Sequence, residues 1–222
     1  MKNKKGFTLT EVLLAVMIVG LISISLAALT RSAARESGVG RSRIMLRNNL
    51  STFMRTLRSD LMTASIVHEC ALCDTAGDQA EFSVANGATV PLLRLTKNQT
   101  HKGVSINSQT PVSVMYCFEK GSDTTNIVPT TATRGGKIYR YEYTDTSLVP
   151  LCSEVIASGK MVLNSVKYIP STEGYAVPMI GRRHFSRSGL NSMLRVNIIT
   201  ELNSTPVVNE TVEETFAVPI GY

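Results

Sequence analysis

One acidic side chain, Glu11, stands alone near the start of a long apolar stretch. The stretch runs from Phe7 to Leu29, and Glu11 is its one formally charged residue. A carboxylate placed in the hydrocarbon of a membrane costs a few kcal/mol, so an acid in such a segment indicates a function and a cationic partner. The position of Glu11 therefore predicts a functional carboxylate that pairs with a cation.

The four cysteines, Cys70, Cys73, Cys117 and Cys152, all follow the apolar stretch. If that stretch is a membrane anchor, they lie in an oxidising compartment, and an even number predicts two disulfides with three possible pairings. We favour Cys70–Cys73 as a local clip and Cys117–Cys152 as a bond between two sheet segments. A thioredoxin-like use of Cys70 and Cys73 lacks the βαβ context it requires, and a zinc site would require a second close pair.

The remaining reactive side chains form no recognisable catalytic set. His68, His101 and His184 are far apart, and no Ser or Asp pattern typical of a triad accompanies them. The basic loop of residues 182–187 is able to contact nucleic acid, the envelope or a partner subunit, but short charge runs are usually solvated. We therefore expect a non-enzymatic protein without catalytic residues, metal or cofactor.

The apolar stretch has the length of a membrane-spanning helix. Its 23 residues reach roughly 34 Å as an α-helix, which exceeds a bilayer core of about 30 Å. Lys2, Lys4 and Lys5 precede it, and they would hold the N-terminal end on the cytoplasmic side. An ordinary secretory signal has a shorter apolar core of about 7–15 residues. Residues 7–29 are thus predicted to be a transmembrane helix with the rest of the chain outside.

The residues around the start of this helix carry a family resemblance. A basic leader, then Gly-Phe-Thr-Leu-Thr-Glu from Gly6 to Glu11, then about twenty apolar residues, resembles the N-terminus of a type IV prepilin or pseudopilin. The resemblance implies cleavage between Gly6 and Phe7 by a prepilin peptidase, which removes residues 1–6, and N-methylation of Phe7. It also implies that Glu11 pairs with the amino terminus of a neighbouring subunit. Thr10 departs from the pattern, since an apolar residue is commoner there.

The helix is predicted to continue as an amphipathic stalk over residues 30–64. Proline is absent from the first 90 residues, so no residue there forbids a helix. Two glycines, Gly38 and Gly40, cost about 1 kcal/mol each relative to alanine, and we expect a kink or local melting at residues 37–40. The apolar residues at helical spacing are Leu46, Leu50, Phe53, Leu57 and Leu61.

Residues 65–222 are predicted to form a β-rich head. Pro and Gly punctuate short alternating runs there, which predicts strands that follow one long helix without helices between them, an α+β pilin-like fold with an antiparallel sheet. Loops are expected at residues 74–79, 120–136 and 181–191. The expected strands are residues 81–84, 91–95, 112–118, 137–143, 161–169, 193–202 and 214–218.

The positive charge belongs to the stalk and not to the head. The chain has a net charge of +6, but residues 31–58 hold seven arginines and one acid, and residues 59–222 hold 13 basic and 15 acidic side chains. Non-specific binding of nucleic acid depends on neutralising phosphates, so this slightly acidic head does not support it.

A second resemblance concerns the head. Its pattern is similar to that of pseudopilin J and of the minor pilin W, in residues 112–118, 137–141, 150–155, 194–200 and 214–218. Together the resemblances imply a minor pilin or pseudopilin, a structural subunit held in the bacterial inner membrane with its head in the periplasm or outside. Its partners would be other pilins and the prepilin peptidase. The alternatives are a subunit of a type II secretion pseudopilus, a pilus-tip module for adhesion or DNA uptake, and an envelope redox enzyme that uses Cys70 and Cys73.

Replacing Gly6 by valine should block processing of the precursor. The peptidase must approach the backbone closely at the cleaved bond, and a side chain at this position would intrude. Immunoblotting of cells that contain the peptidase should show the precursor alone, whereas Lys4→Gln should still be processed. A mature-sized product from Gly6→Val would contradict the prepilin assignment.

Overall fold

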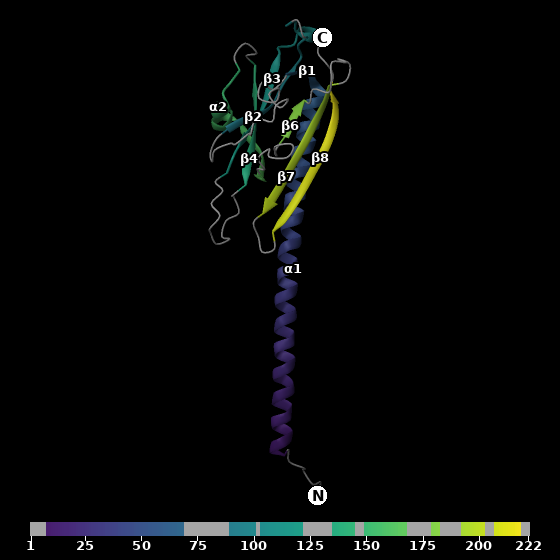
Figure 1. The fold of residues 1–222 in the computed structure, drawn as a ribbon, viewed down its shortest axis with the longest axis vertical. Helices are drawn as coiled ribbons and strands as arrows, with labels where there is room; N and C mark the ends of the chain where they lie inside the picture. The colour runs from purple at the N-terminus through teal and green to yellow at the C-terminus, as the bar shows by residue number, and fades with distance from the viewer. Residues whose placement is uncertain are drawn as a thin grey trace, which may run out of the picture. The chain divides into compact units, whose positions relative to one another are not determined.

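The computed structural model describes residues 8–68, 89–100, 103–121, 135–144, 149–167, 179–182, 192–202 and 207–218. The chain divides into two compact units, Met1–Ser42 and Arg43–Tyr222. Helix α1 (Leu9–Thr63) contributes to both of them (Figure 1).

In the first unit, the side chains of α1 are nearly all exposed. Every residue from 8 to 38 is exposed, and large apolar side chains such as Leu13 and Val16 are 58% and 67% exposed. The helix is also uninterrupted at Gly38 and Gly40, so the local melting expected at residues 37–40 is wrong. Once a helix exists, each added residue gains a backbone hydrogen bond, and without a proline two glycines do not end it.

In the second unit, the end of α1 packs against the sheet. The expected apolar stripe is confirmed, because Leu46, Leu50, Phe53, Leu57 and Leu61 are all buried. The helix ends at Thr63, and strand β1 (Ala64–His68) follows with no intervening loop. The sequence analysis did not predict β1, because a strand of five residues directly after a helix shows too little alternation.

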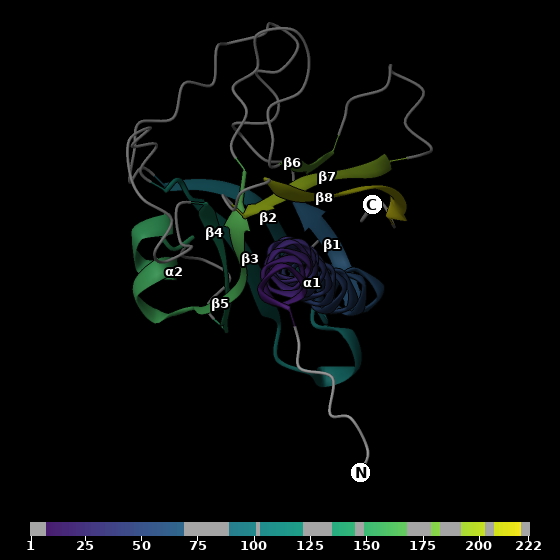
Figure 2. The same cartoon turned by 90° about the horizontal axis from the view of Figure 1, so that it is seen from below.

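Eight described strands form one antiparallel sheet. Its order is β1-β2-β3-β4-β5-β7, with β8 along one edge of β7 and β6 along the other. Figure 2 shows these strands around the C-terminal part of α1. The further strands are β2 (Thr89–Lys97), β3 (Val112–Glu119), β4 (Gly136–Tyr143), β5 (Lys160–Val166), β6 (Met179–Arg182), β7 (Ser192–Leu202) and β8 (Val208–Val218).

The strand expectations are confirmed at β2, β3, β4 and β7, and β8 is longer than residues 214–218. Strand β5 ends at Val166, before the expected limit of 169, while the expected strand 81–84 and loop 74–79 lie outside the described residues. Two loop boundaries are wrong, since Gly136 begins β4 and Gly181 and Arg182 end β6. One or two residues at the end of a predicted loop are too few to show the apolar–polar alternation of a strand.

A short helix, α2 (Cys152–Ser158), lies between β4 and β5, so the expectation of strands without intervening helices is wrong. Its first turn is held by the Glu154 carboxylate, which accepts the backbone N–H of Leu151 at 3.0 Å. Seven residues are too few for a helical period to be visible in the sequence. A single 3-10 turn (Ile106–Ser108) precedes β3.

Strand β3 is buried on both faces. Val114, Tyr116 and Phe118 join the main core with α1, whereas Met115 and Cys117 join a smaller cluster with Val155 of α2. The side chains of a strand alternate between its faces, so β3 serves two cores at once. The sheet is thus covered by α1 on one face and by α2 on part of the other.

Cys117 and Cys152 form a disulfide, with Cα atoms 5.7 Å apart, as expected. The bond joins β3 to α2, so the expectation that it connects two sheet segments is wrong. It closes a separation of 35 residues, for which chain entropy predicts a stabilisation of about 3–4 kcal/mol. Cys70 and Cys73 lie outside the described residues, and their pairing stays a prediction.

A protein truncated to begin at Gly40 should be soluble, because it lacks the apolar stretch and keeps the second unit with its core. After high-speed centrifugation of a detergent-free lysate, it should remain in the supernatant, whereas the full chain should sediment with the membranes. If the truncated protein also sediments and is released only by detergent, the anchor lies elsewhere.

Candidate assembly site

Glu11 is fixed by the residue that precedes the helix. Its Oε2 accepts the backbone N–H of Thr8 at 2.9 Å and the Thr8 hydroxyl at 3.0 Å. Thr8 Oγ1 in turn lies 3.4 Å from the backbone nitrogen of Glu11. This is the reciprocal arrangement of a capping box, which satisfies backbone donors that the first turn of a helix leaves unpaired.

The other carboxylate oxygen of Glu11 has no partner among the described residues, and the side chain is exposed. Towards the C-terminus of the helix, the same face carries Val12, Val16 and Val19, which are 52%, 67% and 61% exposed. An unpaired anionic oxygen therefore stands at the end of an uncovered apolar surface. This arrangement can accept a cation from a second molecule while the neighbouring apolar surfaces bury one another.

A protein-family model, the prokaryotic N-terminal methylation motif, matches residues 1–27. This match supports the similarity of the N-terminus to those of type IV prepilins and pseudopilins. No curated protein and no solved structure matches the chain. The head's similarity to pseudopilin J and minor pilin W is accordingly not confirmed.

The methylation motif suggests processing by a prepilin peptidase and assembly with other pilins, as a structural subunit. Among the described residues, α1 is the one helix long and apolar enough to cross a membrane. The motif and this helix together fit a single-pass protein of the inner membrane. Gly6 and Phe7 lie outside the described residues, so the cleavage and methylation sites stay predictions.

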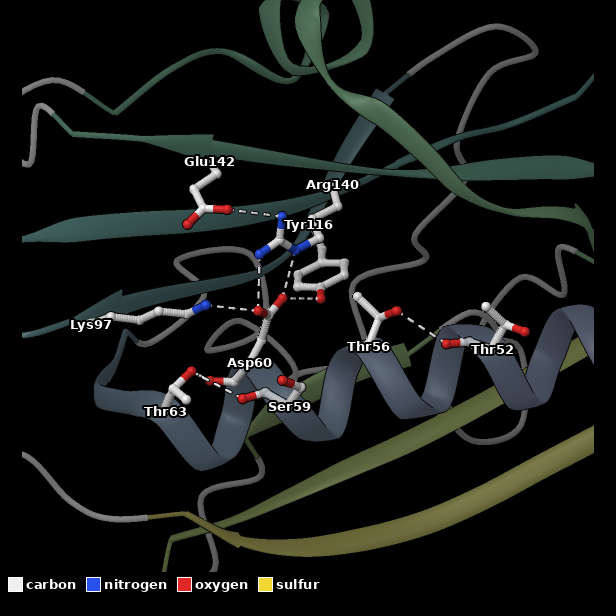
Figure 3. A network of polar contacts seen from close by, with 9 residues as sticks. All are labelled: Thr52, Thr56, Ser59, Asp60, Thr63, Lys97, Tyr116, Arg140 and Glu142. Carbon is white, nitrogen blue, oxygen red and sulfur yellow. Dashed lines mark hydrogen bonds and ion pairs between the residues drawn. The ribbon is translucent and has the colours of Figure 1, made fainter.

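The head contains a second charged site, centred on Asp60 of α1 (Figure 3). Asp60 is only 3% exposed, and it receives hydrogen bonds from three strands. Arg140 of β4 donates through Nε to Oδ2 at 2.6 Å and through Nη2 to Oδ1 at 2.9 Å. Lys97 of β2 donates to Oδ1 at 2.8 Å, and the Tyr116 hydroxyl of β3 donates to Oδ2 at 2.5 Å.

These contacts decide the protonation of the cluster. Burial alone would raise the pKa of Asp60, but the hydrogen bonds from Arg140, Lys97 and Tyr116 outweigh it and hold that pKa below its ordinary value. Burial and the charge of Asp60 raise the pKa of Tyr116, and the hydrogen bond to Asp60 raises that of Arg140. Asp60 is therefore ionised at neutral pH, while Tyr116 keeps its proton and Arg140 its charge.

The Asp60 cluster was not predicted, although the sequence holds a partial signal for it. Asp60 lies three residues after Leu57, on the buried stripe of the helix, where an acid requires a partner. Its partners could not be identified, because they lie on strands 37, 56 and 80 residues away in sequence. The cluster joins α1 to β2, β3 and β4 and so fixes the register of the helix on these strands.

The other residues considered as sites do not come together. His68 ends β1, where its Nε2 lies 2.6 Å from the Thr96 hydroxyl, while His101 and His184 are outside the described residues. Arg182 ends β6, and the rest of the basic loop is also outside them. Within the part of the chain that the structure describes, no three His, Cys, Asp or Glu side chains form a metal-binding group.

Asp60→Asn should lower the free energy of unfolding by about 3 kcal/mol, because it leaves the partly buried cations Lys97 and Arg140 without their buried anion. Urea unfolding of the protein truncated at Gly40 measures this loss. Glu142→Gln is the matched control, since Glu142 also bonds Arg140, at 3.1 Å, but its side chain is 48% exposed. Its expected cost is at most about 1 kcal/mol.

The difference in the free energy of unfolding between the wild type and Asp60→Asn should also depend on pH. The folded-state pKa of Asp60 lies below its unfolded-state value of about 3.9, so the folded protein gains stability from the ionised group above that pH. The gain is lost as the pH falls from about 4 through the folded-state pKa. The difference between wild type and Asp60→Asn should thus shrink only below about pH 4. A constant difference down to pH 2 would contradict this origin.

Proposed function

We propose that the protein is a minor pilin, a structural subunit of a type IV pilus that acts in filament assembly or priming. One observation carries the proposal: an uncovered apolar helix of membrane-spanning length bears an exposed carboxylate with one free oxygen. The described residues of the chain do not bury that surface, so lipid and then other helices would cover it.

Assembly would exchange one environment of α1 for another. In the membrane, residues 7–29 are surrounded by lipid, and the carboxylate of Glu11 is costly there. In the filament, cleavage after Gly6 would have created an amino terminus at Phe7, which is then methylated and remains cationic. Glu11 would accept this cation from a neighbouring subunit, and the ion pair would offset its burial and set the axial register of the helices.

The Cys117–Cys152 disulfide supports a head outside the cytoplasm, in the periplasm or on the cell surface, because disulfides persist in oxidising compartments. The prepilin motif is equally compatible with a subunit of a type II secretion pseudopilus, which is the alternative. The genes beside this one would separate the two systems: a retraction motor favours the pilus, and a set that includes a secretin and exported hydrolases favours secretion.

Glu11→Gln and Glu11→Ala should leave membrane insertion and processing intact but abolish incorporation into filaments. Both remove the anion that attracts the neighbouring amine, and the amide of Gln keeps the shape of the side chain, so charge is the tested property. Sheared filaments are probed with antibody to the head, and Thr10→Ile serves as the control because it changes an adjacent residue and keeps Glu11. If either Glu11 variant reached the wild-type level in filaments, assembly would not depend on this ion pair.

A further inference from the structure

Three arginines, Arg31, Arg35 and Arg41, follow the apolar stretch within the first unit. All three are exposed, and none forms an ion pair among the described residues. One acid, Glu36, lies among them. The first unit thus passes from an apolar surface to an unneutralised basic one within a few residues.

The helical spacing does not neutralise these charges. Residues three and four apart are neighbours on a helix, and at those distances Arg31 and Arg35 meet each other and otherwise only alanine, serine, glycine or valine, none of which is charged. Glu36 has serine, alanine, valine and glycine at the same distances, so no arginine lies where it would pair with Glu36 along the helix. Like charges one turn apart destabilise a helix, so this arrangement is unfavourable unless an anion outside the chain compensates it.

We propose that Arg31, Arg35 and Arg41 form a basic collar that binds the phosphates of anionic phospholipids in the outward-facing leaflet of the inner membrane. This inference rests on the proposed function, since it requires that residues 7–29 span that membrane. The planar guanidinium group donates two parallel hydrogen bonds to a phosphate, a geometry that favours arginine for this ligand. The collar is therefore a lipid-binding site on the unassembled subunit.

The positions along the helix fit the headgroup layer. At about 1.5 Å per residue, Arg31 and Arg35 lie about 3 Å and 9 Å beyond Leu29. Each headgroup layer is about 5–7 Å thick, and long basic side chains bend towards it from nearby turns. Arg41 lies about 18 Å beyond Leu29, and its side chain extends back towards the surface, where charges still act over a Debye length of about 8 Å.

The distribution around the helix favours lipid over one acidic protein face. At about 100° per residue, Arg35 lies about 40° from Arg31 on one side, and Arg41 lies about 80° from Arg31 on the other. Lipids surround a membrane helix from several directions, whereas a single partner surface contacts one side of it. The collar follows directly on the segment that lipids cover, so it meets their headgroups without any further partner.

Processing would make the collar more important. The lysines of the leader, Lys2, Lys4 and Lys5, lie on the inward side, and the proposed cleavage removes all three. Before cleavage they orient the helix. After it, the side chains that are basic and close to the membrane all lie on the outward side, so the collar is then what resists displacement of the subunit along the membrane normal.

The preference for anionic lipid can be measured directly. The full chain is reconstituted into phosphatidylcholine vesicles that contain a trace of spin-labelled phosphatidylglycerol or spin-labelled phosphatidylcholine, and the motionally restricted fraction of each label is recorded. We expect the wild type to prefer phosphatidylglycerol about fivefold, and 1 M salt to abolish the preference. The leader lysines contribute equally to every variant, so comparison between variants isolates the collar.

The test variant is R31Q/R35Q, and the matched control is R47Q/R55Q. Each removes two exposed arginines that form no ion pair among the described residues, and glutamine keeps the helix propensity. The preference should fall at least twofold in R31Q/R35Q and stay at the wild-type value in R47Q/R55Q. The proposal would be overturned if the wild type restricted both spin-labelled lipids equally. It would also be overturned if R31Q/R35Q and R47Q/R55Q lost the preference for phosphatidylglycerol to the same extent.

A filament assay separates this inference from the proposed function. If R31Q/R35Q keeps the full lipid preference but no longer enters filaments, the arginines face acidic groups of a neighbouring subunit, and the lipid site is wrong. If the wild type shows the lipid preference but never enters filaments, the proposed function is wrong and the collar stands.

Discussion

The carboxylate of Asp60 is the contact on which the register of the head depends. It receives four hydrogen bonds, from Lys97, Tyr116 and twice from Arg140, and so joins one position of α1 to β2, β3 and β4 at once. Apolar packing alone tolerates sliding of a helix along a sheet, whereas a buried charge tolerates no position but the one where its partners are. The stripe from Leu46 to Leu61 is the apolar surface of the helix that is buried in the head, and Asp60 determines where along the sheet it packs.

Further contacts join strand β8, at the edge of the sheet, to the same helix. Arg58 donates to both carboxylate oxygens of Glu214 at 2.6 Å and 2.7 Å, and its guanidinium lies 5.9 Å from the ring centroid of Phe216. Arg43 lies 3.4 Å from Glu210. These pairs are half-exposed and individually weak. They show why the stalk arginines divide by role: Arg43 and Arg58 have acidic partners on β8, whereas Arg31, Arg35 and Arg41 have none among the described residues.

The two acids of α1 that matter most illustrate opposite ways to satisfy a carboxylate. Asp60 is buried and fully paired within the chain, so its charge stabilises the fold of the monomer. Glu11 is exposed, and among the described residues only Thr8 bonds its carboxylate, through one oxygen, so the other oxygen is left for another molecule. A structural subunit needs both conditions, a head whose charges are internally balanced and an anchor whose charge is not.

Local patterns in the sequence were sufficient for the long apolar helix, the N-terminal methylation motif, the buried stripe of the helix and most strand positions. Each of these features depends on residue types and their spacing within about twenty consecutive residues, so it can be read from the sequence. The same patterns were misleading at Gly38 and Gly40, where intrinsic propensity predicted melting and the continuity of a long helix prevailed.

Only the tertiary structure decided the strand order, the place of α2, and the partners of Asp60. The order β5-β7 with β6 on the same edge of β7 depends on which strands meet after the chain has curled, and no local pattern carries that information. Asp60 was visible as an acid on an apolar stripe, but Lys97, Tyr116 and Arg140 reach it from distant strands. Pairing over such separations is set by packing of the whole head, whereas the apolar length of the N-terminal helix depends only on consecutive residues, and that is why the sequence alone was enough to predict it.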